Sequence, residues 1–243
     1  MTVPMDVVVV GGGVAGRSAA LFTARHGLDT LVVDSGESIL RRNAHLENFP
    51  GFPAGVNGRQ LLDLLEEQAA EAGCEQVTGT VTRVERTGEG FAVETGDGDR
   101  YHATYVVAAT KNAVGYLDGI DGVGIINRGK AFVDTDERGR TGIDGLYAAG
   151  RLAEKPHQAI VCAGHGAEVG VTILEDDNRP FYHDWVAPEG YFTDRGRELP
   201  PGCEEIDGEE RRERERRSLE VTPERFAEPH PDEQVNHPSL TEE

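Results

Sequence analysis

A glycine-rich segment near the start of the chain carries the clearest chemical signal. Residues 11–16 read G-G-G-V-A-G and match the pattern G-x-G-x-x-G. They follow the β-branched run 6–10, which is typical of a buried parallel strand, and they open a predicted helix over 14–26. Asp34 ends the next apolar run, 31–34. Strand, glycine turn, helix and terminal acid together predict a βαβ unit that binds a dinucleotide.

Each glycine of the pattern has a separate physical task. Gly11 permits the tight turn, Gly13 lets the backbone approach a pyrophosphate, and Gly16 lets the helix pack closely on the strand. Free N–H groups at the start of the helix then face the phosphate charge. The Asp34 carboxylate can accept hydrogen bonds from both ribose hydroxyls, which disfavours a 2′-phosphate. The alternative is a glycine-rich turn without a ligand.

The remaining elements that must position this turn form an α/β pattern with a small antiparallel insertion. A loop is predicted over 35–56, where the apolar periodicity is interrupted. The further predicted elements are a helix over 58–72, short strands over 76–86, 90–95, 101–108 and 145–149, and a helix over 156–175.

Composition changes near residue 179 and predicts a second region. Eight of the 12 prolines lie after this point. We expect a domain at 1–178 and an acidic, proline-rich C-terminal extension at 179–243 that is partly disordered, chiefly after Pro223. Within it, the run 209–217 alternates charge and suits an exposed helix.

Five aromatic residues between 181 and 192 are too apolar to be left in water. The plain interpretation is that this stretch packs back onto its own domain. The sharper alternative is that it caps a ligand site or a subunit interface.

Charge and composition exclude several functions. The 243 residues hold 44 acidic and 24 basic side chains, a formal charge of -20, which disfavours nucleic acid and anionic membrane surfaces as partners. No apolar run approaches the ~20 residues of a membrane span, and the start lacks the pattern of a secretory signal. We expect a soluble cytoplasmic protein.

Lysine and cysteine usage adds two expectations. Only three basic residues are lysines, which suits a protein from concentrated salt; a high-GC genome is the alternative explanation. The three cysteines show no C-x-x-C and no zinc spacing, so neither a disulfide framework nor a metal site is expected.

Several segments resemble the thioredoxin reductase group of flavoprotein pyridine nucleotide–disulfide oxidoreductases. They are E-N-F-P-G at 47–51, Ala109-Thr110, G-L-Y-A-A-G at 145–150 and H-Q-A-I-V-C-A-G at 157–164. Together with the glycine fingerprint they occur in the family's order over about 5–175. The first and last of them are the most specific. The resemblance implies an FAD/NAD(P)-binding Rossmann-like domain with a parallel sheet.

By this resemblance the nucleotide is FAD. The fingerprint would hold its pyrophosphate, Asp34 its adenosine ribose, the backbone near Val81 its adenine, and the 150–151 turn its ribityl chain. The segment 157–159 would face the flavin pyrimidine ring, where a helix N-terminus stabilises negative charge. The residues predicted to bind the cofactor are Gly11, Gly13, Val14, Ala15, Gly16, Asp34, Ser35, Arg42, Asn48, Val81, Ala109, Thr110, Gly150, Arg151, His157, Gln158 and Ala159.

The chain also departs from the family's pattern. The family inserts a nicotinamide-binding domain after the A-T-G segment, whereas here Ala109-Thr110 is followed closely by 130–134. A second G-x-G-x-x-G and the redox C-x-x-C are both missing from the sequence. Lys111 stands where the family has glycine. Arg151 stands where it has the ribityl-binding aspartate, and its guanidinium could instead reach a phosphate.

The catalytic residues are not identified by the sequence, which offers only two weak candidates. Cys162 lies near the expected flavin, where a thiol with a lowered pKa could react; more often such a cysteine is a small packing residue. His157 could transfer protons, since histidine titrates near neutrality, although its role could equally be positioning.

These observations predict an FAD-dependent, NAD(P)H-type oxidoreductase that passes electrons or hydride between an external donor and an unknown acceptor, without its own disulfide. A redox partner protein or a separate nicotinamide-binding chain would complete it, and we expect a homodimer. The alternative is a non-catalytic dinucleotide-binding module with a regulatory or assembly role.

Overall fold

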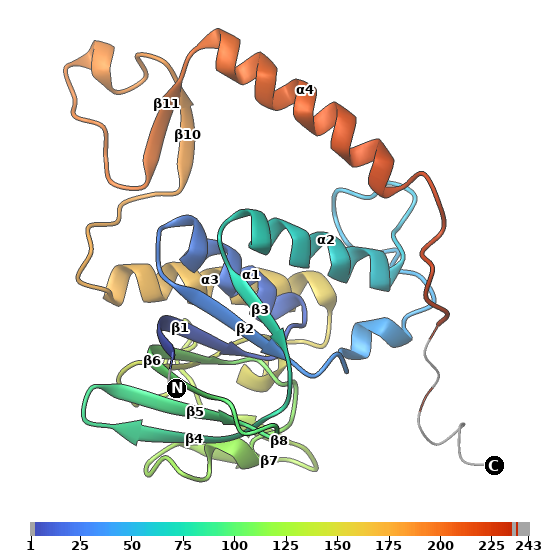
Figure 1. Ribbon diagram of the computed structural model, residues 1–243, viewed down its shortest axis with the longest axis vertical. Helices are drawn as coiled ribbons and strands as arrows, with labels where there is room; N and C mark the ends of the chain where they lie inside the picture. Colours follow the sequence, from blue (N-terminus) through green and yellow to red (C-terminus); the bar gives the residue numbers. More distant parts are fainter. Residues whose placement is uncertain (1–2, 235–236, 238–243) are drawn as a thin grey trace. The chain divides into compact units, whose positions relative to one another are not determined.

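The computed structural model describes residues 3–234 and 237 (Figure 1). Its contacts divide the chain into two compact units. Unit 1 comprises Met1–Ile173 and Gln234–Glu243, and unit 2 comprises Leu174–Glu233. The domains 1–178 and 179–243 stay a prediction, because contacts alone do not test whether either part folds independently.

Unit 1 is an α/β structure built on a seven-stranded sheet. The strand order is β3-β2-β1-β6-β5-β4, and β9 pairs with β6. The pairs β1·β2, β1·β6, β2·β3 and β6·β9 are parallel, whereas β4·β5 and β5·β6 are antiparallel. The strands are β1 (Val3–Val10), β2 (Thr30–Asp34), β3 (Glu75–Thr78), β4 (Val81–Thr87), β5 (Gly90–Thr95), β6 (Arg100–Ala108) and β9 (Leu146–Ala148).

The valine run of β1 forms the centre of the sheet. Val8 and Val10 belong to a core cluster that includes Phe91 of the β4–β5 hairpin, while Val7 and Val9 alternate with them along the strand. All four valines are 3% exposed or less. A parallel strand covered on both faces needs apolar residues at every position, which explains the continuous run.

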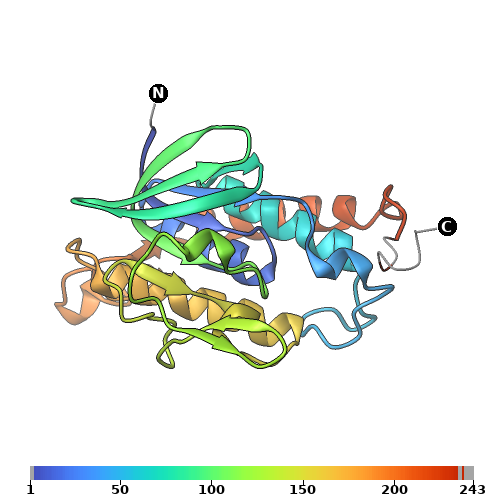
Figure 2. The same cartoon turned by 90° about the horizontal axis from the view of Figure 1, so that it is seen from below.

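Helices cover one side of the parallel strands, and antiparallel strand pairs lie on the other side. Figure 1 shows α1, α2 and α3 above β1, β2 and β3, with the β4–β5 hairpin and the β7–β8 pair below; Figure 2 views this lower side. These elements are α1 (Val14–Arg25), α2 (Gly58–Glu71), α3 (Ala159–Asp176), β7 (Ile125–Asn127) and β8 (Ala131–Val133). The helix α3 packs tightly on α1, since a Cβ at Gly166 would lie 2.0 Å from the Ala15 carbonyl oxygen.

One predicted strand is wrong in its extent. The stretch 76–86 is two strands, because β3 pairs with β2 whereas β4 turns away to pair with β5. Short 3-10 helices occupy parts of the predicted loops. They are η1 (Ile39–Arg42), η2 (Gly115–Leu117) and η3 (Gly150–Ala153).

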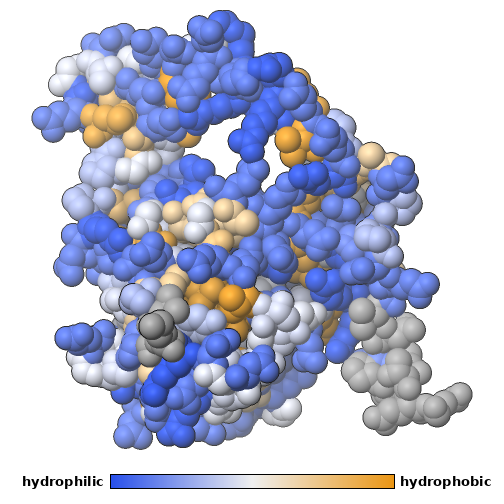
Figure 3. Space-filling model, in the orientation of Figure 1, coloured by the Kyte–Doolittle hydropathy of each residue, from blue (hydrophilic) through white to orange (hydrophobic). Residues whose placement is uncertain are grey.

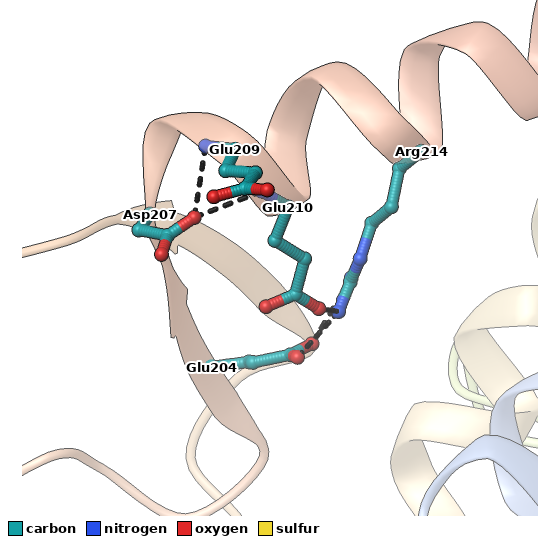
Figure 4. Close-up of polar contacts among 5 residues, drawn as sticks. All are labelled: Glu204, Asp207, Glu209, Glu210 and Arg214. Atoms are coloured by element: carbon teal, nitrogen blue, oxygen red, sulfur yellow. Dashed lines mark hydrogen bonds and ion pairs between the residues drawn. The ribbon is translucent and has the colours of Figure 1, made fainter.

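Unit 2 combines a parallel strand pair with a charged helix. β10 (Trp185–Pro188) pairs with β11 (Cys203–Ile206), and α4 (Gly208–Arg225) extends well beyond the predicted run 209–217. The Asp207 carboxylate caps α4 by accepting from the backbone N–H groups of Glu209 and Glu210, at 2.9 and 2.8 Å (Figure 4).

An ion-pair triad joins α4 to β11 within unit 2. Arg214 donates to Glu204 and to Glu210 at 2.5 and 2.6 Å, and these carboxylates raise the pKa of Arg214 (Figure 4). No residue of α4 is buried. Such exposed pairs are worth only ~0.2–1 kcal/mol each, so this helix depends on many weak contacts.

Three aromatic residues of the extension, Trp185, Tyr191 and Phe192, pack edge to face within unit 2. The rings of Trp185 and Tyr191 lie 4.5 Å apart, those of Tyr191 and Phe192 lie 5.0 Å apart, and the Arg195 guanidinium covers Tyr191 at 4.1 Å. Phe192 is buried in this cluster. The predicted disorder after Pro223 falls partly on residues 235–236 and 238–243, which lie outside the described residues.

The surface is dominated by hydrophilic side chains, with hydrophobic residues restricted to patches on the face shown in Figure 3. Among the described residues, no helix combines the length and the apolar character needed to cross a membrane.

Candidate functional site

A cavity of about 560 Å³ opens where the parallel strands of unit 1 end. Val10 ends β1, Asp34 ends β2, Ala109 follows β6 and Ala149 follows β9. Ligands of open α/β sheets bind at the carboxyl ends of the strands, so the cavity lies where this fold places a site. Its lining residues are Val10, Gly11, Gly12, Gly13, Val14, Ala15, Val33, Asp34, Ser35, Glu37, Ser38, Ile39, Leu40, Asn43, Leu46, Asn48, Gly79, Thr80, Val81, Ala109, Thr110, Lys111, Ala113, Tyr116, Ala149, Arg151, His157, Gln158, Ala159 and Cys162.

Most of the predicted cofactor-binding residues lie on this one cavity. Three do not line it: Gly16, Gly150 and Arg42. A Cβ at Gly16 would lie 1.9 Å from the Gly11 carbonyl oxygen, so Gly16 acts in the packing of α1 on the turn. Gly150 has φ +65°, and a Cβ there would lie 2.6 Å from the Ala15 Cβ. Both glycines therefore allow close packing next to the cavity without lining it.

The turn between β1 and α1 leaves its backbone facing the cavity. Gly11 adopts φ +106°, which favours glycine, and a Cβ there would lie 2.8 Å from the Ala109 carbonyl oxygen. Gly13 is the N-cap of α1 and supplies no side-chain cap. A Cβ at Gly13 would meet only Ser38 Oγ, at 3.7 Å, and would project into space that the cavity holds open. The first N–H groups of α1 are thus left for an anionic ligand.

Asp34 is held beside this turn by a buried arginine that sequence reasoning missed. The Arg17 guanidinium lies 3.6 Å from Asp34 Oδ2, donates to the Leu62 carbonyl oxygen at 2.7 Å, and pairs with Glu66. Burial lowers the pKa of Arg17, and the Glu66 and Asp34 carboxylates oppose that shift. A charged residue directly after the last fingerprint glycine was the available signal. We call Gly11–Gly13 with Asp34 and Val81 the nucleotide end of the cavity.

The loop after β2 is more ordered than its sequence indicates. Leu40, Leu46 and Val56 form a small core cluster with Leu61 and Leu62 of α2. This cluster fixes η1 beside the cavity, where Ser38, Ile39, Leu40 and Asn43 line it. The apolar spacing across this loop is irregular, which is why sequence analysis did not assign these residues.

Two segments that are far apart in the sequence meet on the wall of the cavity. The Asn48 side-chain amide donates to Gln158 Oε1 at 2.9 Å, which joins the E-N-F-P-G segment to the segment before α3. Both residues line the cavity, and Ala159 begins α3 there. Amide side chains and a helix N-terminus at this point can hydrogen-bond a polar ring edge.

Basic side chains lie beside these amides. Lys111, Arg151 and His157 all line the cavity, and we call them the basic end. Burial lowers the pKa of Lys111, and the positive charge of Lys130 lowers it further. Burial also lowers the pKa of His157, followed by the charges of Lys111, Arg151 and Lys130. These shifts favour the neutral form of the imidazole.

Lys111 and Arg151 mark the departures from the family's pattern. Lys111 adopts φ +65°, a left-handed conformation that suits glycine, so the backbone keeps the shape while the side chain differs. The Arg151 guanidinium lies 4.7 Å from the centre of the Phe132 ring and donates to the Lys155 carbonyl oxygen at 3.2 Å. Arg151 lines the cavity and places a guanidinium where the resemblance implies an aspartate carboxylate.

The candidate nucleophile Cys162 lies on the cavity in a packing environment. Its Sγ is 3.5 Å from the Pro156 carbonyl oxygen, and burial raises the pKa of the thiol. A protonated thiol is a weak nucleophile, so these contacts favour the packing role.

Two buried groups that sequence reasoning missed support the walls. The Tyr116 hydroxyl lies 2.9 Å from Thr110 Oγ1, and burial raises the pKa of Tyr116. Gly150 N–H donates to His165 Nδ1 at 3.0 Å, and burial lowers the pKa of His165 to about 4. The roles of Tyr116 and His165 depend on contacts in the folded chain, which local sequence patterns do not show. Among the described residues, no group of three His, Cys, Asp or Glu side chains could hold a metal ion.

Known protein families match much of unit 1. The family described as "Pyridine nucleotide-disulphide oxidoreductase" matches residues 44–166, and the family described as "FAD binding domain" matches residues 6–46. A bifunctional thioredoxin reductase/thioredoxin from Mycobacterium leprae is 39% identical over 46% of this chain and 25% of its own length. The thioredoxin reductase of Aquifex aeolicus is 36% identical over 43% of this chain and 33% of its own length. The chain thus spans a quarter to a third of these relatives.

Solved structures share the fold. A thioredoxin reductase from Gloeobacter violaceus has a TM-score of 0.63 and 18% identity, covering 75% of this chain and 100% of that chain. An oxidoreductase from Agrobacterium tumefaciens has a TM-score of 0.62 and 17% identity, covering 72% of this chain and 98% of that chain.

The cavity fits FAD at both ends. The open space at Gly13, the uncapped start of α1 and the Asp34 carboxylate suit a pyrophosphate and a ribose. The Asn48 and Gln158 amides suit the polar edge of a flavin ring. The volume of about 560 Å³ lies within the ~300–1,000 Å³ that is usual for cofactor pockets.

Proposed function

The chain belongs to the pyridine nucleotide-disulphide oxidoreductase family, and we propose that it is an FAD-dependent enzyme that passes electrons or hydride between an external donor and an acceptor. The observation that carries this proposal is the Asn48–Gln158 hydrogen bond, at 2.9 Å, on the wall of the same cavity as the glycine turn. A module that held only a nucleotide would have no use for a paired amide edge at the far end.

Each group of residues has a proposed task. The start of α1 would hold the pyrophosphate, Asp34 the ribose hydroxyls, and Val81 would adjoin the adenine. When bound, the flavin supplies two-electron chemistry, including hydride transfer. Asn48 and Gln158 would orient its polar edge. The basic end would favour negative charge there, as the N-terminus of α3 also does.

His157 is the residue proposed to move a proton. It lines the cavity beside Gln158, and its lowered pKa favours the neutral imidazole, which is the form that can accept a proton. Cys162 is proposed to pack rather than to react, because burial raises the pKa of its thiol.

The electron donor is proposed to lie outside this chain. In the described stretch between β6 and β9 the chain has only η2, β7 and β8, and the sequence has no second G-x-G-x-x-G and no C-x-x-C. A separate nicotinamide-binding chain or a redox partner protein would then supply or accept the electrons. We also propose a homodimer that works in the cytoplasm and in concentrated salt, in keeping with the charge of -20.

Anaerobic reduction of the FAD-loaded protein tests the proposal. We expect dithionite to bleach the flavin absorbance and NADPH alone to do so slowly, with acceleration by a partner fraction from the same cells. His157→Asn should slow turnover at neutral pH while the protein retains the flavin. Rapid bleaching by NADPH alone would contradict the external donor. Bound FAD that no donor or partner can turn over would favour the non-catalytic module.

A further inference from the structure

A second cavity, of about 450 Å³, opens at the tip of the β7–β8 hairpin. The backbone turns tightly here, since Arg128 N–H donates to the Lys130 carbonyl oxygen at 3.0 Å and Gly129 adopts φ +74°. The turn thereby places two cationic side chains on the same cavity. The lining residues are Arg128, Gly129, Lys130, Phe132, Arg151 and Glu154.

This cavity is cationic in a strongly acidic protein. It holds Arg128, Lys130 and Arg151 against the single carboxylate of Glu154, whereas the whole chain carries -20. Glu154 pairs with Arg128 at 3.1 Å. Within the described residues the Lys130 ammonium forms no hydrogen bond or ion pair, and the Arg151 guanidinium donates only to a backbone carbonyl, that of Lys155. Two positive charges are thus left without a carboxylate.

These charges act on one another and on the first cavity. Lys130 lowers the pKa values of both Lys111 and His157, after the larger effect of burial. Groups that repel one another in this way gain free energy when an anion binds between them. The Phe132 ring also lines the cavity, but it is buried and the Arg151 guanidinium lies 4.7 Å from its centre. The charged lining of the cavity is therefore mainly cationic, which suits an anion.

Arg151 lines both cavities and connects them. From this we propose that the second cavity binds the carboxylate or phosphate of a small molecule that reacts at the first cavity. The Arg151 guanidinium can bind such an oxyanion through paired N–H donors, and Lys130 adds a point charge. The identity of the molecule as a reactant rests on the proposed function; anion binding at the β7–β8 tip does not.

Binding of two simple probes to the FAD-loaded protein at low ionic strength tests the proposal. Inorganic phosphate and acetate, titrated by calorimetry, separate a phosphate site from a carboxylate site. We expect one of them to bind and Lys130→Ala to weaken it on the order of tenfold, because the variant loses a charge-assisted hydrogen bond to the anion. Arg128→Ala should weaken it less, because Arg128 already has a carboxylate partner.

Arg100→Ala is the matched control, since it also removes an exposed arginine that has an acidic partner, Glu94 at 3.3 Å, on another strand. It should leave anion binding unchanged. Circular dichroism checks that all variants fold, which their exposed positions favour. Equal anion affinity in Lys130→Ala, Arg128→Ala and wild type would overturn the proposal, as would no binding of either probe.

If the protein fails to take up FAD, the anion site can still be tested separately from the proposed function. Anion binding would then be compared in Lys130→Ala and in Gly13→Val, whose substitution lies at the glycine turn. Loss in the first variant and retention in the second would support the anion site while the flavin function failed. The reverse pattern would place the anion at the glycine turn and reject the site.

Discussion

The two ends of the main cavity are built in different ways. The nucleotide end uses backbone N–H groups, glycines whose Cβ positions are blocked or must stay open, and one carboxylate. The basic end uses the side chains of Lys111, Arg151 and His157, at positions that include both departures from the family's pattern. Backbone geometry leaves few alternatives, whereas side-chain charges can be exchanged. We therefore expect the nucleotide end to govern which cofactor binds and the basic end to govern what reacts with it.

The largest expected effect is on the nucleotide end. Gly13→Val should weaken FAD binding at least 100-fold, because the branched side chain would project into the space that the pyrophosphate needs. Its extended backbone (φ -76°) accepts valine, and a Cβ meets only Ser38 Oγ, so the protein should still fold. Fluorescence titration with FAD measures the affinity.

Gly88→Val is the control for that titration. Gly88 lies between β4 and β5, with no atom within 4 Å of its Cβ position. It should bind FAD as wild type does. A folded Gly13→Val protein with full FAD affinity would show that the pyrophosphate lies elsewhere.

The next largest effect is expected at Gly16, in the turn behind the nucleotide end, where even a methyl group is too large. Gly16→Ala places a Cβ 1.9 Å from the Gly11 carbonyl oxygen, and overpacking of this kind costs ~1–3 kcal/mol or more. Thermal denaturation should show a large fall in Tm. Gly164→Ala, in α3 with open space around its Cβ position, should instead hold or raise Tm, since alanine favours helix. Equal melting temperatures for the two variants would contradict the close packing.

The stability contributed by His165, which accepts a hydrogen bond from Gly150 N–H, should depend on pH. Burial lowers the pKa of His165 from 6.5 to about 4, so between these values the unfolded chain binds the proton more readily than the folded chain. Its contribution is complete above pH 6.5 and is lost as the pH falls toward 4, amounting to roughly 3 kcal/mol at most.

His165→Gln isolates that contribution, because glutamine can still accept from Gly150 N–H but does not titrate. Free energies of unfolding from urea titrations should fall more steeply in wild type than in His165→Gln between pH 7 and pH 4. Parallel curves for the two proteins would rule out a buried neutral imidazole.

The smallest effect concerns backbone strain at the basic end. Lys111 adopts φ +65°, so Lys111→Gly should stabilise the protein by up to ~1 kcal/mol. Lys111→Ala removes the same ammonium but keeps the Cβ, and it should not gain this stability. Differential scanning calorimetry compares the two. If alanine stabilises as much as glycine, relief of charge repulsion rather than of backbone strain is the cause.

The features that could be predicted from the sequence are mainly those set by the backbone, as at the nucleotide end. The β1–α1–β2 unit, its glycines and Asp34 were predicted because each depends on local pattern and backbone sterics. The sequence also placed Asn48, Arg151 and Gln158 at one site, through the resemblance to a family. The thioredoxin-reductase-like fold and the α/β class are confirmed.

What was missed depends on partners distant in the chain. The stretch 76–86 splits because β3 and β4 pair with different strands, which local alternation does not encode. Arg17 is buried because Asp34, Glu66 and the Leu62 carbonyl surround it. The β10–β11 pair has no alternation of polar and apolar residues to indicate it.

The absorption spectrum of the purified protein in molar salt, with released FAD counted after denaturation, tests the central claim most directly. Our account predicts the two visible bands of oxidised flavin and close to one FAD per chain, held by the cavity at the ends of β1, β2 and β6. A colourless protein that also fails to take up added FAD would contradict it.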